Sequence, residues 1–167
     1  MHAVFDSESE EQTLSLGRKL GGFLSRGDVV GIKGELGAGK SVLVRGICEG
    51  LGIKQRTRSP SFTFMNRYRG PVDVYHIDLY RIGDPGDLAT LGWEEVVYGE
   101  AITLIEWAEK LAPFLPPVSI EVDIEVTGEE TREIRLAAVA ERQKSIIEDV
   151  LMTCEQDDER DTGDNRD

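Results

Sequence analysis

The residues with the clearest chemical meaning are the eight from Gly34 to Ser41, which read Gly-Glu-Leu-Gly-Ala-Gly-Lys-Ser. They match the whole G-x-x-x-x-G-K-[ST] pattern of a phosphate-binding loop. Glycines let the backbone turn tightly, and its N–H groups and the following helix direct positive potential at a phosphate. In this pattern Lys40 reaches the β- and γ-phosphates and the Ser41 hydroxyl is a Mg²⁺ ligand. The predicted nucleotide-binding residues here are Glu35, Leu36, Gly37, Ala38, Gly39, Lys40, Ser41 and Val42.

The segments on either side of the loop support this interpretation over a chance glycine-rich turn. Residues 29–33 are a short apolar run typical of a buried strand, and residues 40–51 carry apolar side chains near helical spacing. A strand, a glycine-rich loop and a helix form the context that the pattern requires. Lys40 is expected to be a surface charge that awaits phosphate.

Two acids follow apolar runs that read as strands, Asp78 after residues 72–77 and Glu106 after residues 101–105. Nucleotide hydrolysis requires carboxylates that hold Mg²⁺ and orient the attacking water. In open α/β sheets such groups lie at the carboxyl ends of strands, beside the phosphate loop. Either acid alone could be a helix cap or part of a solvated turn. Together with the loop, they predict catalytic roles for Lys40, Asp78 and Glu106 and a metal site at Ser41, Asp78 and Glu106.

A run of hydroxyl side chains precedes the first of these acids. Ser61 and Thr63 lie in Ser59-Pro-Ser-Phe-Thr-Phe64, on the connection between the loop helix and the next strand. In nucleotide switch proteins this connection senses Mg²⁺ and the γ-phosphate. An ordinary Ser/Thr-rich loop is the alternative. His76 is interpreted as a structural residue, because phosphoryl transfer depends on positioning and electrostatics rather than on a histidine base.

Composition limits the class of protein. The chain has 167 residues, which suits one domain, and a formal net charge of −13. Residues 155–167 hold seven acids and two arginines, a contribution of −5, so the rest of the chain carries −8. This charge argues against a broad surface that grips nucleic acid. The N-terminus lacks the pattern of a secretory signal, no apolar run suits a membrane span, and two cysteines fit a reduced, cytoplasmic protein.

The pattern along the chain predicts an α/β fold like that of P-loop NTPases, with three layers and a mostly parallel central sheet. An antiparallel hairpin over residues 118–138 is expected at its side. The predicted helices cover residues 9–25, 40–51, 86–91, 93–98 and 139–153, and the predicted parallel strands cover 29–33, 73–78 and 102–106. Residues 54–71 read as a polar connection. The predicted organisation is a single domain over residues 1–154 and an acidic, disordered tail over residues 155–167.

Four strings of residues occur together in a distinctive order. They are Gly34–Ser41, Ser59–Phe64, His76-Ile-Asp-Leu-Tyr-Arg81 and Ile105-Glu-Trp107. In this order and spacing they resemble the TsaE (YjeE) family, and the similarity extends over about residues 9–140. The last two strings are more specific to that family than the phosphate loop is.

The resemblance implies an ATPase with Mg²⁺ that works with the TsaB and TsaD proteins in making threonylcarbamoyladenosine in tRNA. TsaD transfers the threonylcarbamoyl group, so tRNA meets this chain only through the complex, and no membrane is involved. By the same resemblance Asp78 serves Mg²⁺ or water, Glu106 is the strand-end acid, and Ser61 and Thr63 belong to the switch-like loop. Ser41 and Ser61 replace common threonines and Ala108 a common proline, without loss of a needed functional group.

Two other functions are compatible with the residues. One is a small kinase of a metabolite, in which Arg81 would serve a lid, although no lid-like insertion is visible. The other is an interaction module in which nucleotide binding alone drives assembly.

Overall fold

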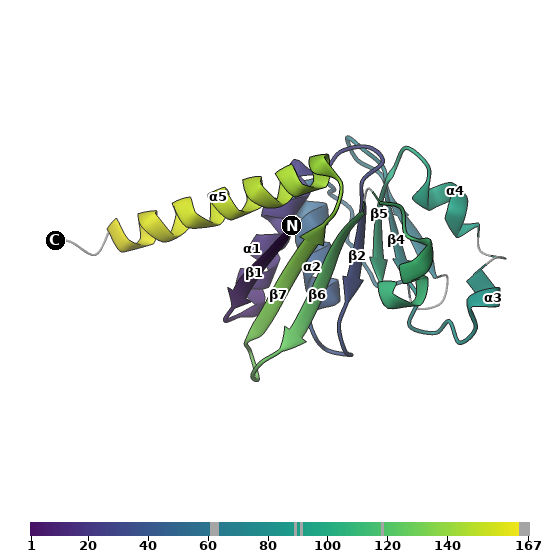
Figure 1. Ribbon diagram of the computed structural model, residues 1–167, viewed down its shortest axis with the longest axis horizontal. Helices are drawn as coiled ribbons and strands as arrows, with labels where there is room; N and C mark the ends of the chain where they lie inside the picture. Colours follow the sequence, from purple (N-terminus) through teal and green to yellow (C-terminus); the bar gives the residue numbers. More distant parts are fainter. Residues whose placement is uncertain (61–63, 89, 91, 118, 164–167) are drawn as a thin grey trace.

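The computed structural model describes residues 1–60, 64–88, 90, 92–117 and 119–163. A seven-stranded mixed sheet forms the centre of the fold (Figure 1). Its strands are β1 (His2–Ser7), β2 (Val29–Lys33), β3 (Met65–Tyr68), β4 (Val74–Asp78), β5 (Ile102–Glu106), β6 (Ser119–Val126) and β7 (Arg132–Ala138). The helices are α1 (Glu10–Phe23), α2 (Lys40–Gly50), α3 (Pro85–Leu88), α4 (Trp93–Val97), α5 (Glu141–Gly163) and a 3₁₀ helix η1 (Ala108–Phe114).

The strands lie in the order β1-β7-β6-β2-β5-β4-β3. The central strands β6, β2, β5 and β4 run parallel, whereas β1 with β7, β7 with β6, and β3 with β4 pair antiparallel. The predicted neighbours β2, β5 and β4 are confirmed, as is the hairpin, which β6 and β7 form. The chain therefore has a P-loop NTPase-like α/β fold.

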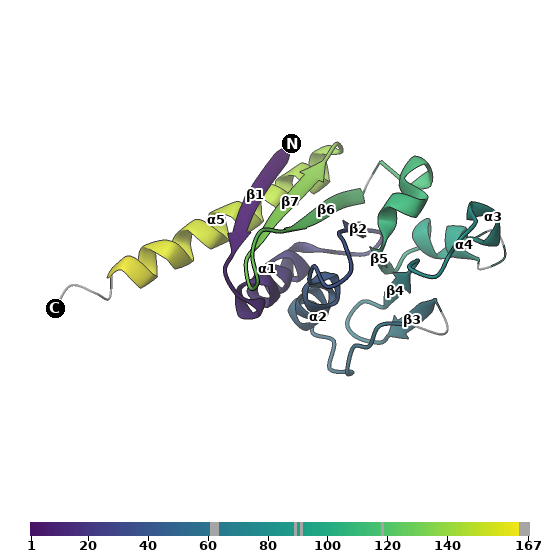
Figure 2. The ribbon, with the colours of Figure 1, turned by 90° about the horizontal axis from the view of Figure 1, so that it is seen from below.

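Helices cover the two faces of the sheet unequally. On one face α1, α2 and α5 cover the sheet (Figure 2). They enclose a large apolar core that includes Val30 of β2, Leu104 of β5 and Ile147 of α5. On the other face η1 and α4 cover a smaller core that includes Val29, Ile105 and Leu111. Because both of its faces are covered, β5 is buried along its whole length and is mostly apolar before Glu106.

The two helices beside the phosphate loop are in unusually close contact. Ser9 caps α1 by accepting a hydrogen bond from the backbone N–H of Gln12, and acids in the first turn favour the helix dipole. Further along, α1 and α2 touch through glycines. A Cβ added to Gly21 would lie 2.2 Å from Ile47 O, and one added to Gly46 would lie 2.3 Å from Leu14 O. Because these glycines have no side chains, the backbones of α1 and α2 approach closely. This contact fixes α2 beside α1.

Two edge strands differ from the sequence prediction. β1 is absent from the predicted strands, because small residues, Ala3 and Ser7, fill its buried positions. β3 lies within residues 54–71, for which the sequence predicts a polar connection. The strand gives a weak pattern because it is only four residues long and carries an exposed Arg67. Short, charged edge strands give a weak apolar alternation and also resist pairing with other chains.

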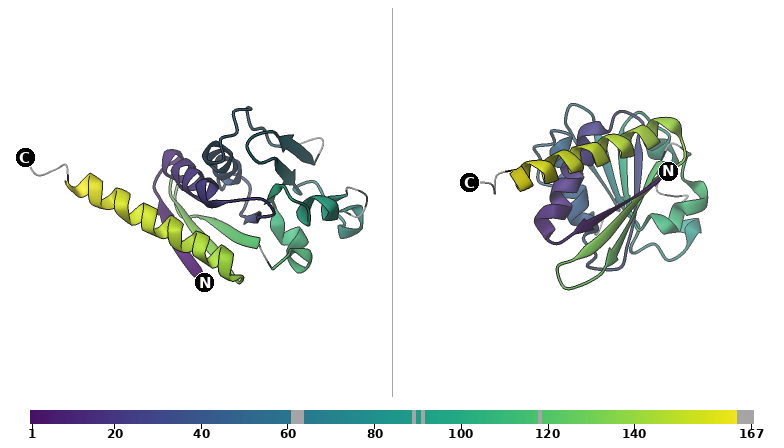
Figure 3. Two further views of the ribbon diagram at one scale, coloured as in Figure 1. Left: turned by 90° about the horizontal axis from the view of Figure 1, so that it is seen from above. Right: turned by 60° about the vertical axis from the view of Figure 1, so that its left-hand side comes forward.

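The last helix also differs from the prediction. α5 continues to Gly163, through part of the segment for which composition predicts disorder, and its second half projects beyond the sheet (Figure 3). Buried Ile146, Ile147 and Val150 anchor its first half. Asp157, which lies beyond Cys154 in the second half of α5, forms an ion pair with Lys19 of α1 at 2.8 Å. Among the described residues, none of the helices has the length and apolar character needed to cross a membrane.

The contact between α1 and α2 predicts opposite effects for two adjacent glycines. Gly21→Ala should lower the free energy of unfolding by about 1–3 kcal/mol, because its methyl group would overlap the backbone of α2. Gly22→Ala is the matched control, since nothing lies within 4 Å of a Cβ at that position. It should stabilise the protein by about 0.5–1 kcal/mol, the usual gain of alanine over glycine in a helix. Urea denaturation of both variants checks this pair, and equal effects would contradict the close packing.

Candidate functional site

The phosphate loop leaves β2 and enters α2 at the end of the parallel strands. Gly34 and Gly39 have φ values of 153° and 105°, which residues other than glycine rarely adopt. A Cβ on Gly34 would also lie 2.9 Å from Ile124 O of the neighbouring strand β6. The loop therefore depends on glycine both for its backbone conformation and for its close approach to the sheet.

Lys40 is buried, with 6% of its surface exposed, rather than the surface charge expected from the sequence. Its ammonium group donates to Gly34 O at 2.6 Å and to Glu35 O at 2.8 Å. It also lies 4.2 Å from the ring centre of Trp107, a cation–π contact. Burial lowers the pKa of Lys40, and the nearby carboxylate of Glu106 opposes that shift. The loop thus satisfies its own lysine in this structure.

An arginine distant in the sequence supports the crest of the loop. Arg132, at the start of β7, donates from Nε to Ala38 O at 2.9 Å and from Nη2 to Gly37 O at 3.3 Å. Its other nitrogen donates to carbonyls of the β6–β7 turn, including Gly128 O at 3.0 Å. One guanidinium group therefore ties the loop to the hairpin.

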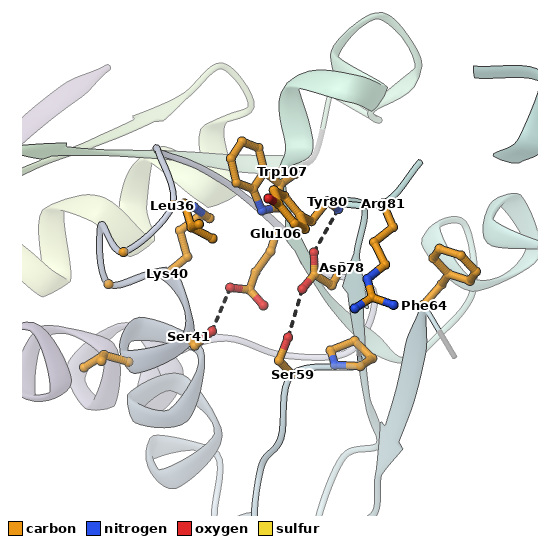
Figure 4. A pocket seen from close by; sticks show the side chains of 14 residues that line it. Leu36, Lys40, Ser41, Ser59, Phe64, Asp78, Tyr80, Arg81, Glu106 and Trp107 are labelled. Atoms are coloured by element: carbon orange, nitrogen blue, oxygen red, sulfur yellow. Dashed lines mark hydrogen bonds between the residues drawn. The ribbon is translucent and has the colours of Figure 1, made fainter. Parts of the chain in front are cut away.

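The two predicted acids end neighbouring parallel strands at the same level. Asp78 of β4 and Glu106 of β5 are direct partners in the register of the sheet. The Ser41 hydroxyl donates to Glu106 Oε1 at 3.1 Å, and the Ser59 hydroxyl donates to Asp78 Oδ2 at 2.9 Å (Figure 4). The structure thus brings Ser41, Asp78 and Glu106 together at one edge of the sheet.

These residues line a pocket of about 470 Å³. Its walls come from the loop, from the segment around Ser59 and from the residues after β4 and β5 (Figure 4). Leu36 and Tyr80 at this pocket are 72% and 50% exposed. The lining residues are Leu36, Gly37, Gly39, Lys40, Ser41, Val42, Ser59, Pro60, Phe64, Asp78, Tyr80, Arg81, Glu106 and Trp107.

The segment after Asp78 is fixed by a lysine that the sequence analysis did not single out. The ammonium group of Lys110 in η1 donates to three carbonyl oxygens, those of Leu79 at 2.8 Å, Tyr80 at 2.9 Å and Ile82 at 2.7 Å. The Tyr80 ring also packs on Trp107, with 5.1 Å between ring centres. One charged group therefore shapes the part of the pocket wall that follows β4.

Glu106 is buried and has a second partner. Its exposed fraction is 3%, and its Oε2 lies 2.7 Å from His76 Nε2, which is equally buried. The other ring nitrogen, Nδ1, lies 3.2 Å from the hydroxyl group of Tyr68. His76 is thus a buried residue with a partner at each ring nitrogen, and one of these partners is a predicted site acid.

The remaining predicted residues have different surroundings. Glu35 contributes its carbonyl oxygen to Lys40, and the carbonyl of Ala38 accepts from Arg132. Ser61 and Thr63 lie outside the described residues. The described part of the chain has no group of three His, Cys, Asp or Glu residues that could hold a metal ion alone. One hydroxyl and two carboxylates nevertheless form a set of hard oxygen donors, the kind that Mg²⁺ prefers.

A phosphate loop with acids at the ends of adjacent parallel strands defines a P-loop protein, and comparison with known proteins identifies its family. The family model "Threonylcarbamoyl adenosine biosynthesis protein TsaE" matches residues 7–134. The chain therefore belongs to the TsaE family.

Individual relatives agree with that family. The tRNA threonylcarbamoyladenosine biosynthesis protein TsaE of Treponema pallidum is 37% identical over 131 residues, which cover 78% of this chain and 97% of that protein. The protein of the same name from Bacillus subtilis is 35% identical over 141 residues, covering 84% and 88%. The crystal structure of YdiB from Bacillus subtilis is 30% identical, covers 92% of this chain and 96% of its own, and superposes with a TM-score of 0.79.

Proposed function

We propose that this chain is a Mg²⁺-dependent ATPase subunit that supports the threonylcarbamoyladenosine modification of tRNA, acting in the cytoplasm with the TsaB and TsaD proteins. Membership of the TsaE family supports the pathway. The observation that carries the ATPase activity is the contact of 3.1 Å between Ser41 and Glu106. It joins the phosphate loop to a strand-end acid within one pocket.

Each side chain has a role that follows from its position. The loop amides and Lys40 bind the phosphates. At Lys40 the phosphates replace the carbonyl oxygens of Gly34 and Glu35 as hydrogen-bond acceptors. The Ser41 hydroxyl donates its hydrogen to Glu106, which leaves an oxygen lone pair for a metal ion. Asp78 lies beside this point and governs the metal together with Ser41. When bound, Mg²⁺ neutralises charge that develops on the phosphates.

Glu106 acts on the attacking water as well as on the metal site. One of its oxygens contacts Ser41 and the other contacts His76, so the carboxylate is fixed at the edge of the pocket. A fixed acceptor can orient a water molecule for in-line attack on the γ-phosphate.

A second hollow gives room for the nucleoside. It has a volume of about 210 Å³ and shares Gly37, Gly39 and Val42 with the first pocket. Thr13 and Arg132 line its other side. A nucleotide whose phosphates lie in the loop could place its ribose and base there, with the γ-phosphate directed at Glu106.

Lys40→Ala should abolish productive ATP binding and hydrolysis, because the phosphates lose their cationic partner. Isothermal calorimetry and an assay of phosphate release measure the two effects. Lys144→Ala is the control, since this lysine pairs with Glu141 at the start of α5. Thermal unfolding separates a local effect from loss of the fold, because Lys40 is buried. Undiminished hydrolysis in folded Lys40→Ala would show that the loop is not the site.

Glu106→Gln and Asp78→Asn should separate water positioning from metal binding. Glu106→Gln should bind ATP as the parent does but turn over about 10²-fold or more slowly, the scale for loss of an acid–base group. Asp78→Asn should instead raise the Mg²⁺ concentration needed for half-maximal rate. Nucleotide affinity and single-turnover hydrolysis across a Mg²⁺ titration test both. Rescue of Glu106→Gln by excess Mg²⁺, with Asp78→Asn unaffected, would exchange the two assignments.

ATP hydrolysis should be slow for the isolated chain and rise when TsaB and TsaD are added. The exposed rim residues Leu36 and Tyr80 leave the pocket open to water, and a partner that covers them would order it. Release of ADP and phosphate is measured with and without the two proteins. Fast, partner-independent turnover would contradict the dependence. A phosphorylated metabolite would favour a kinase, and full tRNA modification by Glu106→Gln would favour an interaction module.

A further inference from the structure

A chain of hydrogen bonds leads from Glu106 into the interior, away from the pocket. Glu106 Oε2 lies 2.7 Å from His76 Nε2, and His76 Nδ1 lies 3.2 Å from the Tyr68 hydroxyl. Tyr68, His76 and Glu106 are 4%, 2% and 3% exposed. They come from β3, β4 and β5, three adjacent strands, and all face the α2 side of the sheet. Water cannot replace a missing partner cheaply at such a depth, so each contact constrains the next.

The inner end of this chain of hydrogen bonds is attached to the segment that precedes Ser61. The Tyr68 hydroxyl donates to Arg58 O at 2.8 Å and accepts from the backbone N–H of Arg58 at 3.1 Å. The hydroxyl group thus contacts both backbone polar groups of Arg58 as well as the His76 ring. The backbone of Arg58 is therefore fastened to the ring that contacts Glu106.

The residue after Arg58 is connected to the other acid. The Ser59 hydroxyl donates to Asp78 Oδ2 at 2.9 Å. Two consecutive residues, 58 and 59, are thus tied to the two acids of the site, one through Tyr68 and His76 and the other directly. A displacement of this segment reaches both carboxylates.

We infer that Tyr68 is a positioning residue for ATP hydrolysis. It acts through His76 and keeps the Glu106 carboxylate in a fixed position relative to the segment Arg58–Ser59. This inference rests on the proposed ATPase function. Tyr68 is not among the residues that line the pocket. Its hydroxyl group sets the orientation of the His76 ring, and the ring in turn sets which way the carboxylate of Glu106 points.

The fold explains why this link can respond to the loop. Glu106 lies at the end of a central strand that is buried on both faces, whereas β3 is an edge strand of four residues. Edge strands have fewer backbone hydrogen bonds to neighbours and open at lower free energy. Tyr68 therefore connects a rigid element that carries Glu106 to the part of the sheet that yields most easily.

Tyr68→Phe tests the inference, because it removes the hydroxyl group and keeps the buried ring. Single-turnover hydrolysis of Mg·ATP should fall by about 10- to 100-fold, the usual effect of losing an outer partner of a site ligand. The affinity for ATP should stay within about threefold, since the phosphate loop is untouched. Tyr75→Phe is the matched control: Tyr75 alternates with His76 on β4 and faces the other side of the sheet. It should hydrolyse ATP as the parent does.

A double variant separates positioning from general destabilisation. In the Glu106→Gln background, Tyr68→Phe should cause no further loss of rate, because the group through which it acts is gone. His76→Gln offers a second route if Tyr68→Phe folds poorly. It should lose rate like Tyr68→Phe, since a glutamine amide can contact Glu106 but loses the hydroxyl link. Losses that multiply in the double variants, or parental rates in Tyr68→Phe, would overturn the inference.

A readout without hydrolysis distinguishes this inference from the proposed function. If the parent chain binds ATP but never hydrolyses it, alone or with TsaB and TsaD, the proposed ATPase fails. A crystal structure of Tyr68→Phe then still tests the positioning role. The inference requires that the Glu106 carboxylate leaves its contact with Ser41, and an unchanged side chain would overturn it.

Discussion

The parallel register of β4, β5 and β2 is the constraint on which the rest of the site depends. It sets Asp78 opposite Glu106 and Glu106 opposite Ile32, which lies two residues before the start of the phosphate loop. Three segments far apart in the sequence therefore reach the same edge of the sheet at the same height. A slip of one residue would turn Glu106 to the other face, because side chains alternate along a strand. Such a slip would separate Glu106 from Ser41 and His76 and leave a buried carboxylate without its partners.

Burial of Glu106 holds its carboxylate in one position and also costs free energy of hydration. A carboxylate with 3% exposure loses most of its hydration, and this loss is compensated only by contacts within the protein. The hydroxyl of Ser41 and the ring of His76 supply one contact to each oxygen. Asp78 is more exposed and has partners of its own in Ser59 and the backbone N–H of Tyr80. The two acids thus occupy different environments although they are neighbours in the register, and this is the physical basis for giving them different roles.

The sequence predicts those parts of the site that are encoded in contiguous strings. The phosphate loop follows from its glycines, and the strand-end acids follow from the apolar runs before them, so the central parallel strands and the hairpin are foreseeable. Contacts between distant segments are not. Arg132 supports Ala38 across 94 positions of the sequence, and no local pattern marks it. Tyr68 was hidden for another reason: its strand is short and at the edge, so residues 54–71 read as a loop.

The same reasoning explains why the role of Lys40 could be expected but its surroundings could not. The pattern places a lysine at the start of α2, yet only the folded loop turns Gly34 O and Glu35 O toward its ammonium group. Trp107 directly follows β5 and has a φ of 59°. The face of its ring is a further partner of the Lys40 ammonium group. Under the proposed function a phosphate would replace these partners rather than meet a free charge. Binding therefore yields only the difference between two sets of interactions. Trp107 directly follows Glu106 in the sequence, so under the proposed function a shift of the indole ring away from Lys40 would reach the residue assigned to the attacking water.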